Sequence, residues 1–272
     1  MKFGVGQPVK RFEDQTLITG KGRYTDDIVL PRMAHACVLR SPVAHARITK
    51  VDASAARAMP GVLLVLTGED VVRDGLGDVP CVAPLSNRDG SPRHDTPRPV
   101  LAVGKVRHVG QPVALVVAET LNEARDAAEA IVVDYDVLPA VTDARAAIAP
   151  GSPQLFDEIP GNVVFDWDND MCDFAATEAA FKAAAHVTRI ELVNNRVVAN
   201  SMEPRNAIGD WDATSGRPVL YTGTQGSHFV RDPLAENVLK LPQKEQLRVV
   251  TPPNVGGGFG MKAFVYPEQA LV

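Results

Sequence analysis

A glycine-rich run near the end of the sequence has the residue types needed to hold an anion. Residues 251–262 read TPPNVGGGFGMK, so three consecutive glycines are followed by Phe259 and Gly260. Glycine permits positive φ angles and leaves backbone N–H groups uncovered, and successive uncovered N–H groups form a concave site for phosphate or oxo-anions. Lys262 could add a positive charge. An ordinary glycine-rich surface turn has the same composition, so the run alone does not decide between these interpretations.

The run does not match the standard nucleotide-binding motifs. The sequence G-x-x-x-x-G-K-[ST] is absent, and the dinucleotide fingerprint would need Gly256, Gly258 and Met261 at its three small-residue positions. The alternative interpretation, that the chain is an unrelated phosphate-binding α/β protein, is therefore supported only by the glycine run.

Two other short segments carry polar groups that could serve a site. In residues 222–225 (TGTQ), Gln225 precedes a predicted helix, where its amide and the first N–H groups of the helix could face one ligand. An ordinary helix cap explains the same segment. In residues 202–205 (MEPR), Glu203 and Arg205 could form a structural ion pair, or the carboxylate could act as a general base.

The composition is typical of one large or two ordinary globular domains. The chain has 272 residues, of which 45% are hydrophobic and 22% are charged. A net charge of −5 offers no basic field for nucleic acid or anionic lipid. We find neither an apolar run long enough to cross a membrane nor a signal peptide. The three cysteines are far apart and match no metal or disulfide motif, so we expect no protein-ligated metal and a cytoplasmic location.

The first half of the chain predicts two strand–helix–strand units against one mixed sheet. Asp52 can cap a helix at 53–59, and the TLNE sequence from Thr120 to Glu123 is a capping box for a second helix. A continuous apolar run, VLLVL at 62–66, predicts a buried strand. Residues 68–99 are rich in proline and glycine and predict a long loop. The remaining predicted strands of this half are 34–39, 48–51, 112–118 and 131–135.

The second half follows a proline-containing segment at 141–159 that we interpret as a linker. Its apolar patterns predict helices at 176–185 and 229–239, and strands at 186–198, 207–211, 218–222 and 247–251. The last of these strands leads into the glycine-rich run, and the strand before it leads into the segment that contains Gln225.

Taken in order, several segments resemble the molybdenum-binding large subunit of the xanthine oxidase family, in particular the large chain of aerobic carbon monoxide dehydrogenase. No single motif is decisive, but the ordered set is specific and covers nearly the whole chain. The matching segments are 40–46 (RSPVAHA), 109–118 (VGQPVALVVA), 127–135 (AAEAIVVDY), 138–139 (LP), 194–196 (NNR), 202–205 (MEPR), 224–225 (TQ) and 256–260 (GGGFG).

The resemblance implies an α+β fold and a cofactor site. An α/β hammerhead domain is expected at 17–140, followed by the first part of a molybdopterin-binding α+β domain at 155–272. The cofactor is expected to be molybdopterin, in its cytosine dinucleotide form, with molybdenum held by the pterin and not by protein side chains. Gln225 matches the glutamine that hydrogen-bonds the molybdenum oxo group. The backbone of Gly257, Gly258, Phe259 and Gly260 matches the loop against the metal centre.

The resemblance also implies water-dependent oxidation of carbon monoxide, an aldehyde or an N-heterocycle. Electrons would pass to [2Fe-2S] and FAD groups on partner subunits. Purine-oxidising members carry a glutamate where this chain has Ala263, so a purine is not expected. The catalytic glutamate of the family lies in a C-terminal region beyond Val272, so we assign no catalytic residue. The chain is expected to be a truncated piece or half of a split subunit that needs the remaining C-terminal part. A non-catalytic scaffold subunit is the alternative.

Overall fold

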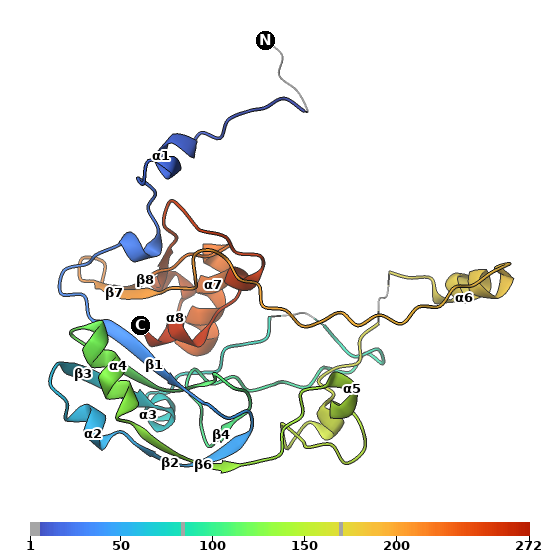
Figure 1. The fold of residues 1–272 in the computed structure, drawn as a ribbon, viewed down its shortest axis with the longest axis horizontal. Helices are drawn as coiled ribbons and strands as arrows, with labels where there is room; N and C mark the ends of the chain where they lie inside the picture. Colours follow the sequence, from blue (N-terminus) through green and yellow to red (C-terminus); the bar gives the residue numbers. More distant parts are fainter. Residues whose placement is uncertain (1–5, 83–84, 169–170) are drawn as a thin grey trace. The chain divides into compact units, whose positions relative to one another are not determined.

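The computed structural model describes residues 6–82, 85–168 and 171–272 (Figure 1). The chain divides into two compact units. The first comprises residues 1–80, 98–136 and 199–272, and the second comprises 81–97 and 137–198. The first unit contains the glycine-rich loop.

After a short helix and a turn that the sequence analysis does not predict, the first unit continues with strands and helices, most of them near the ranges that the apolar patterns predict. Its second part is a small sheet with helices and turns around it. In chain order the elements are α1 (Asp14–Ile18), η1 (Thr25–Asp27), β1 (His35–Arg40), β2 (Ala46–Asp52), α2 (Ser54–Arg57), β3 (Val62–Thr67), α3 (Gly68–Arg73), β4 (Lys105–Val106), β5 (Pro112–Ala118), α4 (Leu121–Glu129), β6 (Val132–Val137), β7 (Ile208–Asp212), β8 (Arg217–Tyr221), α7 (Ser227–Pro233), η3 (Leu234–Val238), η4 (Lys244–Gln246), β9 (Arg248–Val250), η5 (Met261–Ala263) and α8 (Pro267–Leu271).

The antiparallel sheet β1–β5–β3 is covered on both faces by apolar side chains. Successive residues of a strand point to opposite faces, so Ala114 and Val116 of β5 pack with α2 and α4, which lie beside this sheet in Figure 1. Leu115 points to the other face and packs with Leu234 and Leu271 from the last quarter of the chain. The sheet is therefore the common wall of two apolar cores.

The prediction of one mixed sheet is wrong, because the strands of this half divide between two sheets. The strands β4, β2 and β6 form a separate three-stranded sheet with its own small core around Ala46, Val106 and Val113. Apolar periodicity identifies strands but not their partners, which depend on contacts between distant residues. The predicted capping box is confirmed: Thr120 Oγ1 accepts from the Glu123 N–H, and the Glu123 carboxylate accepts from the Thr120 N–H.

Two further predictions for this half need correction. Strand β3 is only partly buried, because Leu63 and Leu64 are 58% and 46% exposed. The region 68–99 is not loop throughout, since it begins with helix α3. Asp70 starts this helix by accepting hydrogen bonds from the backbone N–H and the hydroxyl of Thr67.

The third sheet has the order β7–β8–β9 and positions the glycine-rich loop. Strand β8 pairs antiparallel with β7 and parallel with β9. Leu220 of β8 and Leu247, at the entrance to β9, pack with the helical residues Val230 and Val238 in the core that also contains Leu115.

The second unit contains α5 (Ala144–Ala147), the turn η2 (Pro160–Asn162) and α6 (Phe174–Ala183). The side chain of Asn162 bonds Ala147 O, Pro153 O and Leu155 N and so holds the turn region together. The predicted strand at 186–198 is wrong: no strand is formed there, and its large apolar side chains are 49–84% exposed, with Ile190 and Leu192 near three-quarters. A strand requires a paired neighbour, and within the described ranges this segment has none.

Candidate functional site

The parallel pairing of β8 and β9 brings two loops to one edge of the sheet. In parallel strands the carboxyl ends lie at the same edge, and here Tyr221 pairs with Val250. The chain leaves β8 toward Gln225 and leaves β9 toward the glycine-rich loop. Hydrogen bonds then join the two loops, because Thr224 Oγ1 and Gln225 N both donate to Lys262 O, at 2.8 and 3.0 Å.

Gln225 lies directly against Gly258. A Cβ atom added to Gly258 would come within 2.6 Å of Gln225 Cδ and Oε1, so only glycine permits this approach. Gln225 is exposed, and its side-chain amide makes no hydrogen bond to any described residue. Gln225 and Gly258 are 33 positions apart in the sequence, and the fold therefore places the free side-chain amide of Gln225 beside the uncovered backbone of Gly258.

The backbone of the loop is turned into a conformation that suits glycine. The φ angles of Gly257 and Gly260 are 98° and 83°, and Phe259 also has a positive φ of 52° with its side chain 78% exposed. Among the described residues, the N–H groups of Gly257, Gly258, Phe259 and Gly260 donate to no protein acceptor. Four consecutive uncovered N–H groups next to an amide fit a group that carries oxo or phosphate oxygens.

Lys262 does not supply a free charge to this site. Its side chain is fully buried, and its ammonium donates to the Glu203 carboxylate at 2.7 Å. Burial alone would raise the pKa of Glu203, but hydrogen bonds from Lys262, Gly256 and Asn206 outweigh it and lower the pKa below its ordinary value. Glu203 is therefore a paired anion and a poor general base.

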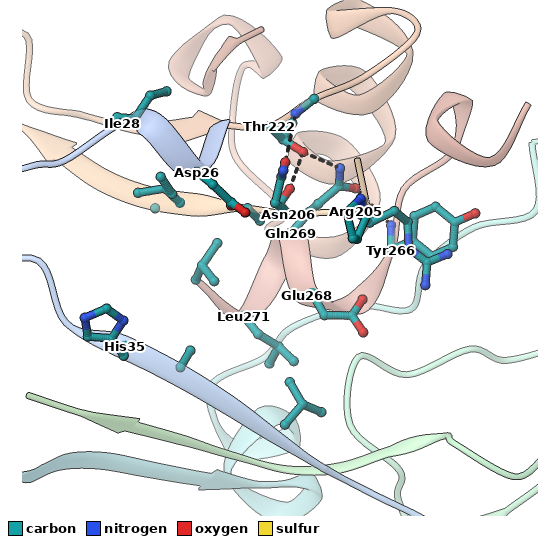
Figure 2. Close-up of a pocket in the computed structure, with 18 of the residues that line it drawn as sticks. Asp26, Ile28, His35, Arg205, Asn206, Thr222, Tyr266, Glu268, Gln269 and Leu271 are labelled. Carbon is teal, nitrogen blue, oxygen red and sulfur yellow. Dashed lines mark hydrogen bonds between the residues drawn. The ribbon is translucent and has the colours of Figure 1, made fainter. Parts of the chain in front are cut away.

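The suggested ion pair between Glu203 and Arg205 does not form. The Arg205 guanidinium lies over the ring of Tyr266, 3.7 Å from its centroid, in a cation–π contact. Both residues line a cavity of about 1000 Å³. Figure 2 shows there the hydrogen bonds that Thr222 makes with Asn206 and Gln269. Neither Gln225 nor Gly258 lines this cavity, so it is distinct from the predicted cofactor site.

Sequence reasoning missed Asn206, and it noted Thr224 only as part of the TGTQ segment without predicting its contact. Asn206 donates to Glu203 and accepts from the Gly223 N–H, and Thr224 fixes the end of the glycine-rich loop. Asn206 directly follows the MEPR segment and its bond to Glu203 is local, whereas its bond to Gly223 and the bond of Thr224 to Lys262 depend on partners far away in the sequence. No group of three His, Cys, Asp or Glu side chains that could hold a metal ion occurs among the described residues. Over the same residues, none of the helices is long and apolar enough to cross a membrane.

Comparison with protein families matches two consecutive parts of the chain. Residues 19–139 match the aldehyde oxidase and xanthine dehydrogenase a/b hammerhead domain. Residues 155–272 match the molybdopterin cofactor-binding domain. The glycine-rich loop and Gln225 lie in the second match.

Individual proteins agree with these matches. The chain is 38% identical to the nicotine 6-hydroxylase large subunit of Paenarthrobacter nicotinovorans, over 98% of this chain and 31% of that protein. It is 35% identical to the carbon monoxide dehydrogenase large chain of Hydrogenophaga pseudoflava, over 94% of this chain and 31% of that protein. The crystal structure of quinoline 2-oxidoreductase from Pseudomonas putida 86 superposes with a TM-score of 0.84 at 39% identity, covering all of this chain and 33% of that one.

The chain spans about a third of the length of these relatives. The order of the two matched domains and the α+β architecture agree with the expectation drawn from the sequence motifs. The chain therefore belongs to the xanthine oxidase family of molybdenum hydroxylase large subunits, and it carries the hammerhead domain followed by sequence of the molybdopterin cofactor-binding domain.

Proposed function

We propose that this chain forms part of the cofactor-binding subunit of a molybdenum hydroxylase, with Gln225 and the backbone of residues 257–260 at the molybdenum centre. The observation that carries the proposal is the contact between Gln225 and Gly258, which sets a free amide beside four uncovered N–H groups. Backbone donors held by an anchored loop stabilise negative oxygen with little reorganisation during a reaction.

The residues of the site have separate roles in this proposal. The cofactor, when bound, supplies the redox centre, and water supplies the oxygen that enters the substrate. The Gln225 amide donates a hydrogen bond to an oxo ligand, and the N–H groups of residues 257–260 bind the remaining negative charge. Glu203 and Lys262 neutralise one another and stay outside the reaction. The base that completes the reaction lies on a part of the holoenzyme outside these residues.

The substrate class follows from the relatives and from one position of the loop. Nicotine and quinoline, the substrates named for two relatives, contain nitrogen heterocycles, and carbon monoxide is named for a third. We include an aldehyde as a further candidate. Ala263 disfavours a purine. The proposed holoenzyme contains the cytosine dinucleotide form of molybdopterin, the remaining C-terminal part of the molybdenum subunit, and partner subunits with [2Fe-2S] and FAD.

The test uses the native complex purified with this chain. We expect molybdenum and pterin in stoichiometric amounts, measured by elemental analysis and by fluorescence of the oxidised pterin. Turnover is assayed with quinoline, benzaldehyde and carbon monoxide. A complex without molybdenum or pterin would overturn the proposal in favour of the scaffold role.

The Gln225→Ala variant tests the site within that complex. A hydrogen bond to a charged acceptor contributes about 1.5–3 kcal/mol, so we expect turnover to fall about ten- to a hundredfold if the bond strengthens in the transition state. The exposed Gln7→Ala variant is the matched control and should leave turnover unchanged. If Gln225→Ala kept wild-type turnover, Gln225 would not belong to the site.

A further inference from the structure

One carboxylate contacts both ends of the glycine-rich loop. Glu203 Oε2 accepts hydrogen bonds from Gly256 N at 2.8 Å and from Lys262 Nζ at 2.7 Å. Oε1 accepts from Asn206 Nδ2 at 3.2 Å, and the Glu203 N–H donates to Gly256 O at 3.0 Å. Gly256 begins the glycine stretch and Lys262 follows its end, so residues 257–261 between them are anchored at both ends to one side chain.

The packing around this carboxylate is close. A Cβ atom on Gly256 would lie 2.5 Å from Glu203 Cβ, so glycine is required for the loop to approach. The Lys262 side chain is 0% exposed and that of Glu203 only 10% exposed. A buried charge is tolerated when it is paired and hydrogen-bonded, and removing one partner leaves the other uncompensated.

The same contacts decide which N–H groups of the loop remain available. The Gly256 N–H is used by Glu203, whereas those of the next four residues have no acceptor in the described part of the chain. The pairing also removes the full positive charge of Lys262 from the site. The loop therefore presents to a ligand the backbone N–H dipoles of residues 257–260, whose direction is fixed.

We infer that Glu203 is the positioning residue of the glycine-rich loop, acting through Gly256 and Lys262 to fix the direction of the N–H groups of residues 257–260. The consequence for cofactor binding rests on the proposed function, whereas the anchoring itself is a property of this chain alone. Glu203 takes no part in the chemistry, since its oxygens are occupied by protein donors.

The anchoring is tested by amide hydrogen exchange on the full chain without cofactor. The reporters are three loop amides whose acceptors depend on the loop conformation: Gln225 to Lys262 O, Met261 to Gly258 O, and Ala263 to Gly260 O. We expect Glu203→Gln and Lys262→Met each to speed exchange at these amides by about tenfold or more, because each leaves one buried charge unpaired. The double variant buries no charge and should restore most of the protection.

A second readout uses the buried lysine as a protease site. Trypsin should cleave after Lys262 at least about tenfold faster in Glu203→Gln, while cleavage after the exposed Lys182 stays the same. The matched control is Asp70→Asn, which removes another largely buried carboxylate that is paired with Arg57 and Arg73. It should lower stability without changing exchange of the loop amides.

The outcomes separate this inference from the proposed function. Unchanged loop exchange in Glu203→Gln, or equal loosening in Asp70→Asn, would overturn the positioning role whether or not the complex retains molybdenum. If the loop loosens as expected, the native complex carrying Glu203→Gln should lose turnover together with molybdenum and pterin content. Loosening with full molybdenum content and full turnover would support the anchoring and overturn the assignment of the loop to the cofactor.

Discussion

Substitution of Gly258 by alanine should separate the geometry of the site from the stability of the fold. The added Cβ would lie 2.6 Å from Gln225 Cδ and Oε1 and 2.7 Å from Cγ. Normal carbon contacts are about 3.5–4.0 Å, so the two groups must move apart by roughly 1 Å. Gln225 is exposed, and its side chain can rotate away more easily than the anchored loop can shift.

We expect Gly258→Ala to lower activity much more than stability. Gly258 is not among the residues with positive φ, so alanine fits its backbone conformation, and the stability change should stay within about 1 kcal/mol. A displacement of the Gln225 amide by roughly 1 Å would lengthen, and so weaken, the hydrogen bond that it is proposed to donate to an oxo ligand. The loss of about 1.5–3 kcal/mol then predicts a fall in turnover of about ten- to a hundredfold, close to that of Gln225→Ala.

The assay compares turnover per molybdenum and the thermal midpoint of the native complex. Gly216→Ala is the control, because this turn residue has a φ of 64° and open space around its Cβ position. It should lower the midpoint by about 2–4 °C through strain of about 1 kcal/mol and leave turnover unchanged. Normal turnover in Gly258→Ala would refute the steric argument. Additive losses in the Gly258→Ala, Gln225→Ala double variant would also refute it, since both substitutions act on one amide.

Two further predictions concern stability. Thr120→Ala should destabilise the chain by about 1 kcal/mol in chemical denaturation by removing the cap of α4, and Thr120→Ser should restore it; no change would show that the cap is redundant. The lowered pKa of Glu203 means that its contribution is present above the ordinary value of 4.5 and is lost as the pH falls below that value. The difference in unfolding free energy between wild type and Glu203→Gln should therefore shrink on acidification from pH 6, and a difference that grows would contradict the assigned direction.

Local sequence pattern predicts the elements of this chain better than their partners. The capping box at Thr120 and most of the strands follow from spacing within a few residues. Helix α3 was missed because its capping pattern, Thr67 with Asp70, lies at the start of a region dominated by proline and glycine. The segment 186–198 has the alternation of a strand but no neighbour to pair with in the described structure.

The candidate site was predictable where it follows chain order. Gln225 and the glycine-rich loop each come after a strand, and these strands pair in parallel, so both loops reach the same edge. The partner of Lys262 was not predictable. Glu203 is 59 residues away from Lys262, and the candidate partner of Glu203 nearer in the sequence was Arg205, two residues further along. Pairing across such separations is set by the folded backbone and leaves no local signal.

The two-faced sheet β1–β5–β3 has a consequence for synthesis on the ribosome. The core on the face toward α2 and α4 is complete once residue 131 has emerged from the ribosome. The core on the face with Leu115 is complete only after Leu234 and Leu271 have been synthesised. At about 5–20 residues per second, the roughly 140 intervening residues take on the order of ten seconds to translate. During that interval Val71, Val100 and Leu101 are among the early members of this core, and the nascent chain presents the rest of an apolar sheet face, which is the kind of surface that molecular chaperones bind. Slower translation of this stretch would lengthen the exposure, so codon usage between the two halves can influence the yield of native protein.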